Sequence, residues 1–145
     1  MKLNIQDVKK EFVSAVKNSK LKNTQQRIQI LETFFEHEGH INVDEIYQLV
    51  KKKNPKIGYA TVYRTLSLLN KLGIIEATKI GNNKVLYEHK YAHNHHDHFI
   101  CTKCNKIIEF ESEELEKLQN QIAKKHKFKI LDHKLIIYGL CDKCR

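Results

Sequence analysis

Apolar residues recur every three or four positions through the first half of the chain, which is the spacing of helices that bury one face. This pattern, with residues that cap or break helices, predicts four helices. They cover residues 1–19, 24–39, 42–55 and 59–72. The third helix should open with a capping box, because Glu45 follows Asn42 by three positions.

The hydrophobic period changes after Gly73, where the fourth helix is expected to end. Residues 75–80 and 84–87 have the pattern of two strands. The residues between them, Gly81, Asn82 and Asn83, tolerate the positive φ of a tight hairpin. Helices followed by such a hairpin predict a winged helix-turn-helix domain, which we assign to residues 1–88.

Residues 89–145 differ in pattern, because the chain there becomes rich in histidine and contains all four cysteines. Strands are expected at 95–102, 106–110, 128–131 and 135–140, with a helix that begins after Ser112. This half is predicted to be a small α+β domain whose exposed strand edges serve dimerisation. The fold class is therefore α+β, with an N-terminal winged helix and a small C-terminal dimerisation domain.

Composition narrows the class of protein. The chain has 145 residues, of which 41% are apolar, as in soluble globular proteins. No run of apolar residues reaches the roughly 20 that a membrane-spanning helix needs. The N-terminus also lacks the apolar stretch of a secretory signal. We therefore expect a cytoplasmic protein without a membrane partner.

The charge points to a polyanionic partner. The formal net charge is +9, and residues 1–88 carry 15 basic and 9 acidic side chains. A basic winged helix suggests double-stranded DNA, bound as a dimer on a near-palindromic operator, and a tetramer on DNA stays open. Lys20 and Lys22 are expected to hold phosphates. The exposed side of the fourth helix supplies the other candidates, which are Ala60, Tyr63, Arg64, Ser67 and Lys71.

The cysteines form two CxxC pairs, Cys101 with Cys104 and Cys141 with Cys144. A reducing compartment disfavours disulfides, so two such knuckles predict one tetrahedral zinc with a structural role. Two disulfides are the alternative.

An enzyme is a less suitable interpretation. Zinc deaminases carry H-x-E before P-C-x-x-C, whereas HDH precedes ICTKC here, and no HExxH occurs. Four thiolates would also leave no open position for water on the zinc. A metal-storage protein would not need a winged helix. We therefore expect no catalytic residues and no small-molecule substrate.

The segments IGYATVYRTLSLLNKLGII, VLYEHK, HHDHFICTKCNKIIEF and YGLCDKC, in this order, resemble the ferric uptake regulator family of metal-dependent bacterial repressors. The resemblance runs from about Leu21 to Cys144. It implies a dimeric, metal-responsive transcriptional repressor with up to three metal sites per subunit. It also places structural zinc on the four cysteines.

The resemblance further implies a regulatory site and a third site. The regulatory ligands would be His40, Glu88, His96, His98 and Glu109, and those of the third site His95, Asp97, Glu116 and His133. Alternation along a strand fits this division, since His96 and His98 would share one side and His95 and Asp97 the other. His37, His93 and His126 are expected to bind no metal, and His89 is left open.

By resemblance the regulatory metal is Fe²⁺, and the regulated genes serve iron uptake. Peroxide-sensing relatives tend to carry Asp where Glu88 and Glu109 stand, which favours iron sensing. Zinc sensing stays open, because mixed nitrogen and oxygen ligands also accept Mn²⁺, Co²⁺ or Zn²⁺ in vitro.

Overall fold

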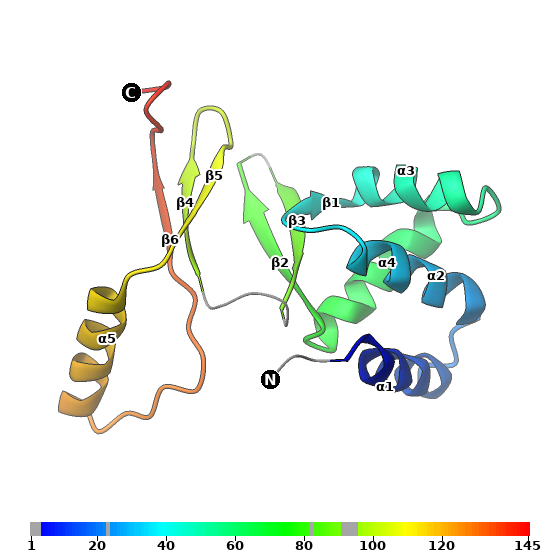
Figure 1. Ribbon diagram of the computed structural model, residues 1–145, viewed down its shortest axis with the longest axis horizontal. Coiled ribbons are helices and arrows are strands. Elements are labelled where there is room, and N and C mark those ends of the chain that lie inside the picture. The colour runs from blue at the N-terminus through cyan, green and yellow to red at the C-terminus, as the bar shows by residue number, and fades with distance from the viewer. Residues whose placement is uncertain (1–3, 23, 82, 91–95) are drawn as a thin grey trace. The chain divides into compact units, whose positions relative to one another are not determined.

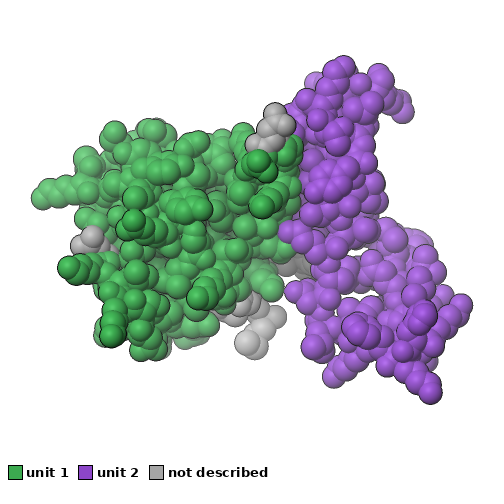
Figure 2. Space-filling view, turned by 180° about the vertical axis from the view of Figure 1, so that it is seen from behind, with its two compact units in different colours: residues 1–93 green, residues 94–145 purple. Residues whose placement is uncertain are grey.

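The computed structural model describes residues 4–22, 24–81, 83–90 and 96–145. Contacts divide the chain into two compact units, residues 1–93 and residues 94–145, which Figure 2 distinguishes by colour. The domain boundary after residue 88, drawn from the sequence, stays a prediction. Within the described ranges, no helix is both long and apolar enough to cross a membrane.

The first unit contains the predicted helices and hairpin (Figure 1). Its elements are α1 (Ile5–Asn18), α2 (Thr24–Phe35), β1 (Ile41–Asn42), α3 (Val43–Lys53), α4 (Tyr59–Lys71), β2 (Ile75–Ile80) and β3 (Lys84–His89). The three strands form an antiparallel sheet in the order β1-β3-β2. One apolar core holds the unit together, with Phe12, Ile30, Phe34, Ile46 and Leu66 among its fully buried members.

Local rules account for where these elements begin and end. The side chain of Asn42 accepts the N–H of Glu45, and the Glu45 carboxylate accepts the N–H of Asn42, each at 2.9 Å. The predicted capping box is thus confirmed. Gly81 and Asn83 adopt positive φ angles of 46° and 63° between β2 and β3. The hairpin prediction is confirmed for these residues, while Asn82 lies outside the described ones.

The described part of the second unit, residues 96–145, consists of a three-stranded sheet and one helix. Its elements are β4 (Asp97–Cys101), β5 (Ile107–Phe110), α5 (Glu113–Lys125) and β6 (Ile136–Gly139). The sheet order is β5-β4-β6, with β4 antiparallel to β5 and parallel to β6. Ser112 begins the helix, because its hydroxyl accepts the N–H of Leu115.

One predicted strand is wrong. Residues 128–131 form no strand, and the N–H of Phe128 instead donates to the carbonyl of Ala123 at 2.8 Å. This bond closes the C-terminal turn of α5, where Lys127 has a φ of 52°. Two of the apolar residues that suggested a strand are exposed, since Phe128 is 69% exposed and Leu131 is 85% exposed.

Candidate metal centres and DNA-binding face

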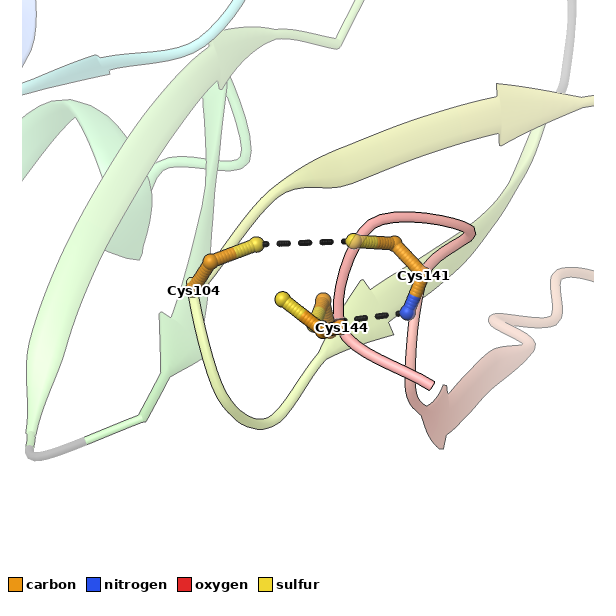
Figure 3. Close-up of side chains that lie close together, drawn as sticks. Cys104, Cys141 and Cys144 are labelled. Carbon is orange, nitrogen blue, oxygen red and sulfur yellow. Dashed lines mark hydrogen bonds between the residues drawn. The ribbon is translucent and has the colours of Figure 1, made fainter.

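The four cysteines come together because of how β4 and β6 pair. The strands run parallel with Cys101 opposite Gly139, so the turns that follow them lie at the same end of the sheet. The sulfur atoms of the four cysteines all lie within 4.8 Å of one another. Figure 3 shows the sulfur atoms of Cys104, Cys141 and Cys144 around a common space.

The sulfur spacing fits a metal ion rather than disulfides. The Sγ atoms of Cys104 and Cys141 are 3.7 Å apart. Zinc–sulfur bonds of about 2.3 Å in a tetrahedron would place two sulfur atoms about 3.8 Å apart. A disulfide would bring them to about 2.05 Å. All four cysteines are free, so the alternative of two disulfides is wrong and the cluster fits a closed zinc site.

The backbone around the cluster favours a thiolate at Cys101. The N–H of Cys141 donates to the sulfur atom of Cys101 at 3.4 Å. This bond, with another from the N–H of Cys104, lowers the pKa of Cys101 to about 6. The Cys144 thiol donates to Cys141 instead, which raises the pKa of Cys144 to about 12. Because the thiolate is the form that binds metal, the turn prepares at least Cys101 for this role.

In the first unit, the sheet places His40 beside Glu88. Ile41 of β1 lies opposite Tyr87 of β3 in an antiparallel pair, so the residue before Ile41 faces the residue after Tyr87. The Nε2 atom of His40 lies 3.1 Å from a carboxylate oxygen of Glu88. Two of the five regulatory ligands implied by the resemblance thus stand together within one unit.

In the second unit, the sheet gathers the other three regulatory candidates. His98 of β4 lies opposite Glu109 of β5. The ring centroids of His96 and His98 are 4.8 Å apart, and Nε2 of His96 lies 3.8 Å from a carboxylate oxygen of Glu109. This set offers two imidazoles and one carboxylate, the donors that Fe²⁺, Mn²⁺ and Zn²⁺ share.

Three of the four candidates for the third site also lie close together within the second unit. Asp97, Glu116 and His133 each place one ligand atom within 4.8 Å of the others. Nε2 of His133 lies 3.1 Å from a carboxylate oxygen of Glu116. Asp97 and His98 are neighbours on β4, so strand alternation directs their side chains to opposite sides of the sheet. His95, the fourth candidate, lies outside the described residues, as does His93.

The remaining histidines have other surroundings. His89 packs in the first unit, where its ring stacks on Phe35 with centroids 4.5 Å apart. Its Nε2 atom lies 2.9 Å from the carbonyl oxygen of Phe34. The structure therefore gives His89, left open by the sequence, a place in the core. Neither His37 nor His126 joins a metal-ligand group among the residues that the structure describes.

Comparisons with known proteins identify the family of this chain. The model of the ferric uptake regulator family matches residues 18–138. The chain belongs to the ferric uptake regulator family. The Ferric uptake regulation protein of Neisseria gonorrhoeae is 36% identical over 134 residues, which cover 92% of each chain.

Two solved structures of this family are similar in fold. The Helicobacter pylori ferric uptake regulator, described as having three functional metal-binding sites, matches with a TM-score of 0.84 and 28% identity. The match covers 99% of this chain and 96% of that one. The Francisella tularensis regulator, solved with iron, matches with a TM-score of 0.71 and 39% identity, covering 86% and 94%.

Membership in the ferric uptake regulator family decides the class of protein. The chain is a metal-responsive, DNA-binding transcription regulator and not an enzyme. This confirms the winged-helix and α+β fold class, with the four-cysteine cluster in the second unit. Regulators of the ferric uptake regulator family act on DNA as dimers.

In this regulator, α4 presents the predicted DNA contacts on one side. Its opposite stripe, Val62, Leu66 and Leu69, is fully buried in the core. The candidate contacts are all exposed, namely Ala60, Tyr63, Arg64, Ser67 and Lys71. Lys20 and Lys22, in the link between α1 and α2, are exposed as well. All of these side chains are therefore available to a partner.

Replacing Arg64 by alanine is expected to weaken operator binding by about 1–3 kcal/mol, or roughly 5- to 150-fold, if its guanidinium reads a base. Selectivity at that base pair should relax as well. The measurement is a titration of the operator and of single-base variants at constant salt. Arg145→Ala is a matched control, since Arg145 is also exposed but lies in the second unit. Equal affinities for Arg64→Ala and Arg145→Ala would remove Arg64 from the contact set.

Proposed function

We propose that this regulator is an iron-responsive repressor, which binds operator DNA as a dimer when loaded with Fe²⁺ and controls genes of iron uptake. The proposal rests on one observation: each unit presents part of a mixed nitrogen and oxygen ligand set. The first unit contributes His40 and Glu88, 3.1 Å apart. The second contributes His98 and Glu109 from paired strands and His96 from just before β4.

The ligand types support a divalent transition metal. Neutral imidazoles and carboxylates suit Fe²⁺, and the negative charge of the carboxylates would attract a divalent cation. The names of the relatives point to the same metal, since the curated relative is a ferric uptake regulation protein and a similar structure holds iron. Glu at positions 88 and 109 favours iron over peroxide sensing, as in the resemblance above.

The distribution of these ligands suggests how metal would control DNA binding. We propose that both sets bind the same ion, which would restrict the orientation of the winged helix relative to the dimerisation unit. In a dimer, this orientation sets the separation of the two α4 helices. Metal and operator would then strengthen each other's binding by the same coupling free energy, commonly about 1–3 kcal/mol.

The second unit offers a surface for the proposed dimer. Large apolar side chains of α5, β6 and their neighbours are exposed in the single chain: Leu118, Ile122, Phe128, Leu131, Ile137, Tyr138 and Leu140. Several large exposed apolar side chains in one small unit are typical of a protein interface. We propose that a second copy of the unit covers them.

We also propose two metal ions besides the regulatory one. A structural Zn²⁺ would bind the four cysteines, and a third metal would bind Asp97, Glu116 and His133, with His95.

An anaerobic titration tests the proposal. Zinc-loaded protein is mixed with operator fragments, selected by binding from genomic DNA, while free Fe²⁺, Mn²⁺ or Zn²⁺ is raised in separate series. Operator binding should require the added metal, and Fe²⁺ should support it. Full operator binding with the regulatory metal removed would contradict the proposed control.

A reporter gene decides which metal is sensed, because affinity in vitro follows the Irving–Williams order whatever the biological signal. Transcription from the operator should rise when an iron chelator is added to the cells. It should not rise with a chelator specific for zinc. Derepression by zinc limitation alone would assign the regulator to the zinc-sensing alternative, and derepression by peroxide alone to the peroxide-sensing one.

A further inference from the structure

A buried arginine connects two segments of the proposed DNA-binding face. Arg27 of α2 is only 5% exposed. Its Nε atom donates to the carbonyl oxygen of Lys22 at 3.1 Å, and its Nη1 atom donates to the hydroxyl of Thr65 at 2.9 Å. The first bond reaches the link that carries Lys20 and Lys22, and the second reaches α4.

The acceptor on α4 is firmly placed. Thr65 is completely buried, and its hydroxyl donates to the carbonyl oxygen of Thr61 at 2.6 Å. Because that proton is committed, the hydroxyl oxygen offers its lone pairs to Arg27. Thr65 follows Arg64 directly, so the anchored turn is the one that carries a predicted DNA contact.

The link is also restrained at its other end. The N–H of Lys20 donates to the carbonyl of Lys17, and the N–H of Leu21 donates to the carbonyl of Val16. Lys20 adopts a φ of 52°, in the left-handed region. The Arg27 bond to Lys22 thus fixes the end of a link whose beginning is fixed by α1.

The charge on Arg27 is costly in the free protein. Burial lowers the pKa of Arg27, and the neighbouring charge of Arg64 lowers it further. A buried charge often stabilises a fold less than an apolar side chain of similar size would. A gain in stability is therefore a weak explanation for a guanidinium here, and precise placement of two segments is a better one.

We infer that Arg27 is a positioning residue for DNA binding. It holds the Lys20–Lys22 link at a fixed place beside α4, so that the two lysines reach phosphates in register with Tyr63 and Arg64. The inference rests on the proposed DNA contacts of these residues. It adds that the link and α4 act as one surface and that Arg27 and Thr65 join them.

Thr65→Val tests this inference with little change of shape. Valine keeps the volume of threonine and removes the hydroxyl that accepts from Arg27. Thr33→Val is the matched control, because Thr33 is also buried and its hydroxyl donates to the carbonyl four residues earlier, that of Gln29, at 2.8 Å. Both variants lose one buried hydroxyl, and only Thr65→Val loses the bond from Arg27.

The measurement is a double-mutant cycle at saturating metal. The Lys20→Gln/Lys22→Gln pair is introduced into the parent, the Thr65→Val protein and the Thr33→Val protein. Removing two phosphate contacts should weaken operator binding on the order of tenfold in the parent. The same loss is expected in Thr33→Val, but it should fall below about twofold in Thr65→Val, where the link is no longer held. Thr65→Ser retains the hydroxyl and should restore the full loss.

An equal loss in all three backgrounds would overturn the inference, because a purely structural role of Arg27 changes stability without changing the contribution of the lysines. No loss in the parent would also overturn it and would remove the link from the DNA contacts. Neither result bears on metal control. Metal-independent operator binding by the parent would instead contradict the proposed function and leave the cycle interpretable.

Discussion

Replacing Cys101 by serine is expected to unfold the second unit and to abolish binding of the proposed structural zinc. The unit, residues 94–145, has a thin core, since none of the α5 residues is buried in the single chain. Units of this size rarely obtain more than about 3–5 kcal/mol from a hydrophobic core alone. Structural zinc contributes about 10–16 kcal/mol in small zinc domains at pH 7, so losing one thiolate removes most of the stabilising free energy.

The measurements are zinc content, circular dichroism and molecular mass by light scattering. Cys101→Ser protein should contain less than one zinc per chain, lose the strand signal of the second unit and run as a monomer or an aggregate. Lys103→Ser is the matched control, because Lys103 is exposed in the same turn and contributes no thiolate. A folded, dimeric Cys101→Ser protein would show that the cluster is not what stabilises this unit.

The elements that the sequence predicts well are those with a repeated pattern. The apolar stripe of α4 spans three turns, so Val62, Leu66 and Leu69 identify its buried side without tertiary information. The paired CxxC turns likewise identify the cysteine cluster, because two such turns are the usual pattern of a zinc site. In both cases the local pattern and the tertiary structure require the same residues.

Elements without a pattern could not be predicted. Strand β1 contains only two residues, too few to show alternation, although its register with β3 brings His40 to Glu88. The segment 128–131 shows the opposite failure, because its apolar residues alternate without a neighbouring strand to pair with in the single chain. Whether a short segment pairs as a strand depends on residues far away in the chain, so its own sequence does not predict the pairing.

Buried polar residues were missed for a related reason. Arg27 looks like one of many basic surface residues, because composition predicts that arginine is exposed. Its hydrogen bond to Thr65 joins residues that are 38 positions apart, and no spacing rule connects them. His89 is similar, since only the fold places its ring on Phe35. For Arg27 a signal was available, because it precedes the buried Ile30 and Leu31 by three and four positions and so shares their side of α2.

Replacing His96 and His98 together by alanine is expected to abolish the metal dependence of DNA binding while the protein stays folded and dimeric. The rings of these residues lie 4.8 Å apart and His98 is paired in register with Glu109, so the double change removes two of the three candidate ligands in the second unit. Operator affinity in the presence of Fe²⁺ should fall by about 5- to 150-fold, the range of a coupling free energy of 1–3 kcal/mol.

The measurement compares operator affinity with and without Fe²⁺ under anaerobic conditions, together with zinc content and molecular mass. His37→Ala/His126→Ala is the matched control, because it also removes two imidazoles, neither of which lies in a metal-ligand group among the described residues. The zinc content of both proteins should equal that of the parent, since the cysteines are unchanged. Unchanged Fe²⁺ dependence in the His96→Ala/His98→Ala protein would show that the regulatory ion binds elsewhere, and the third site at Asp97, Glu116 and His133 would then be the first to examine.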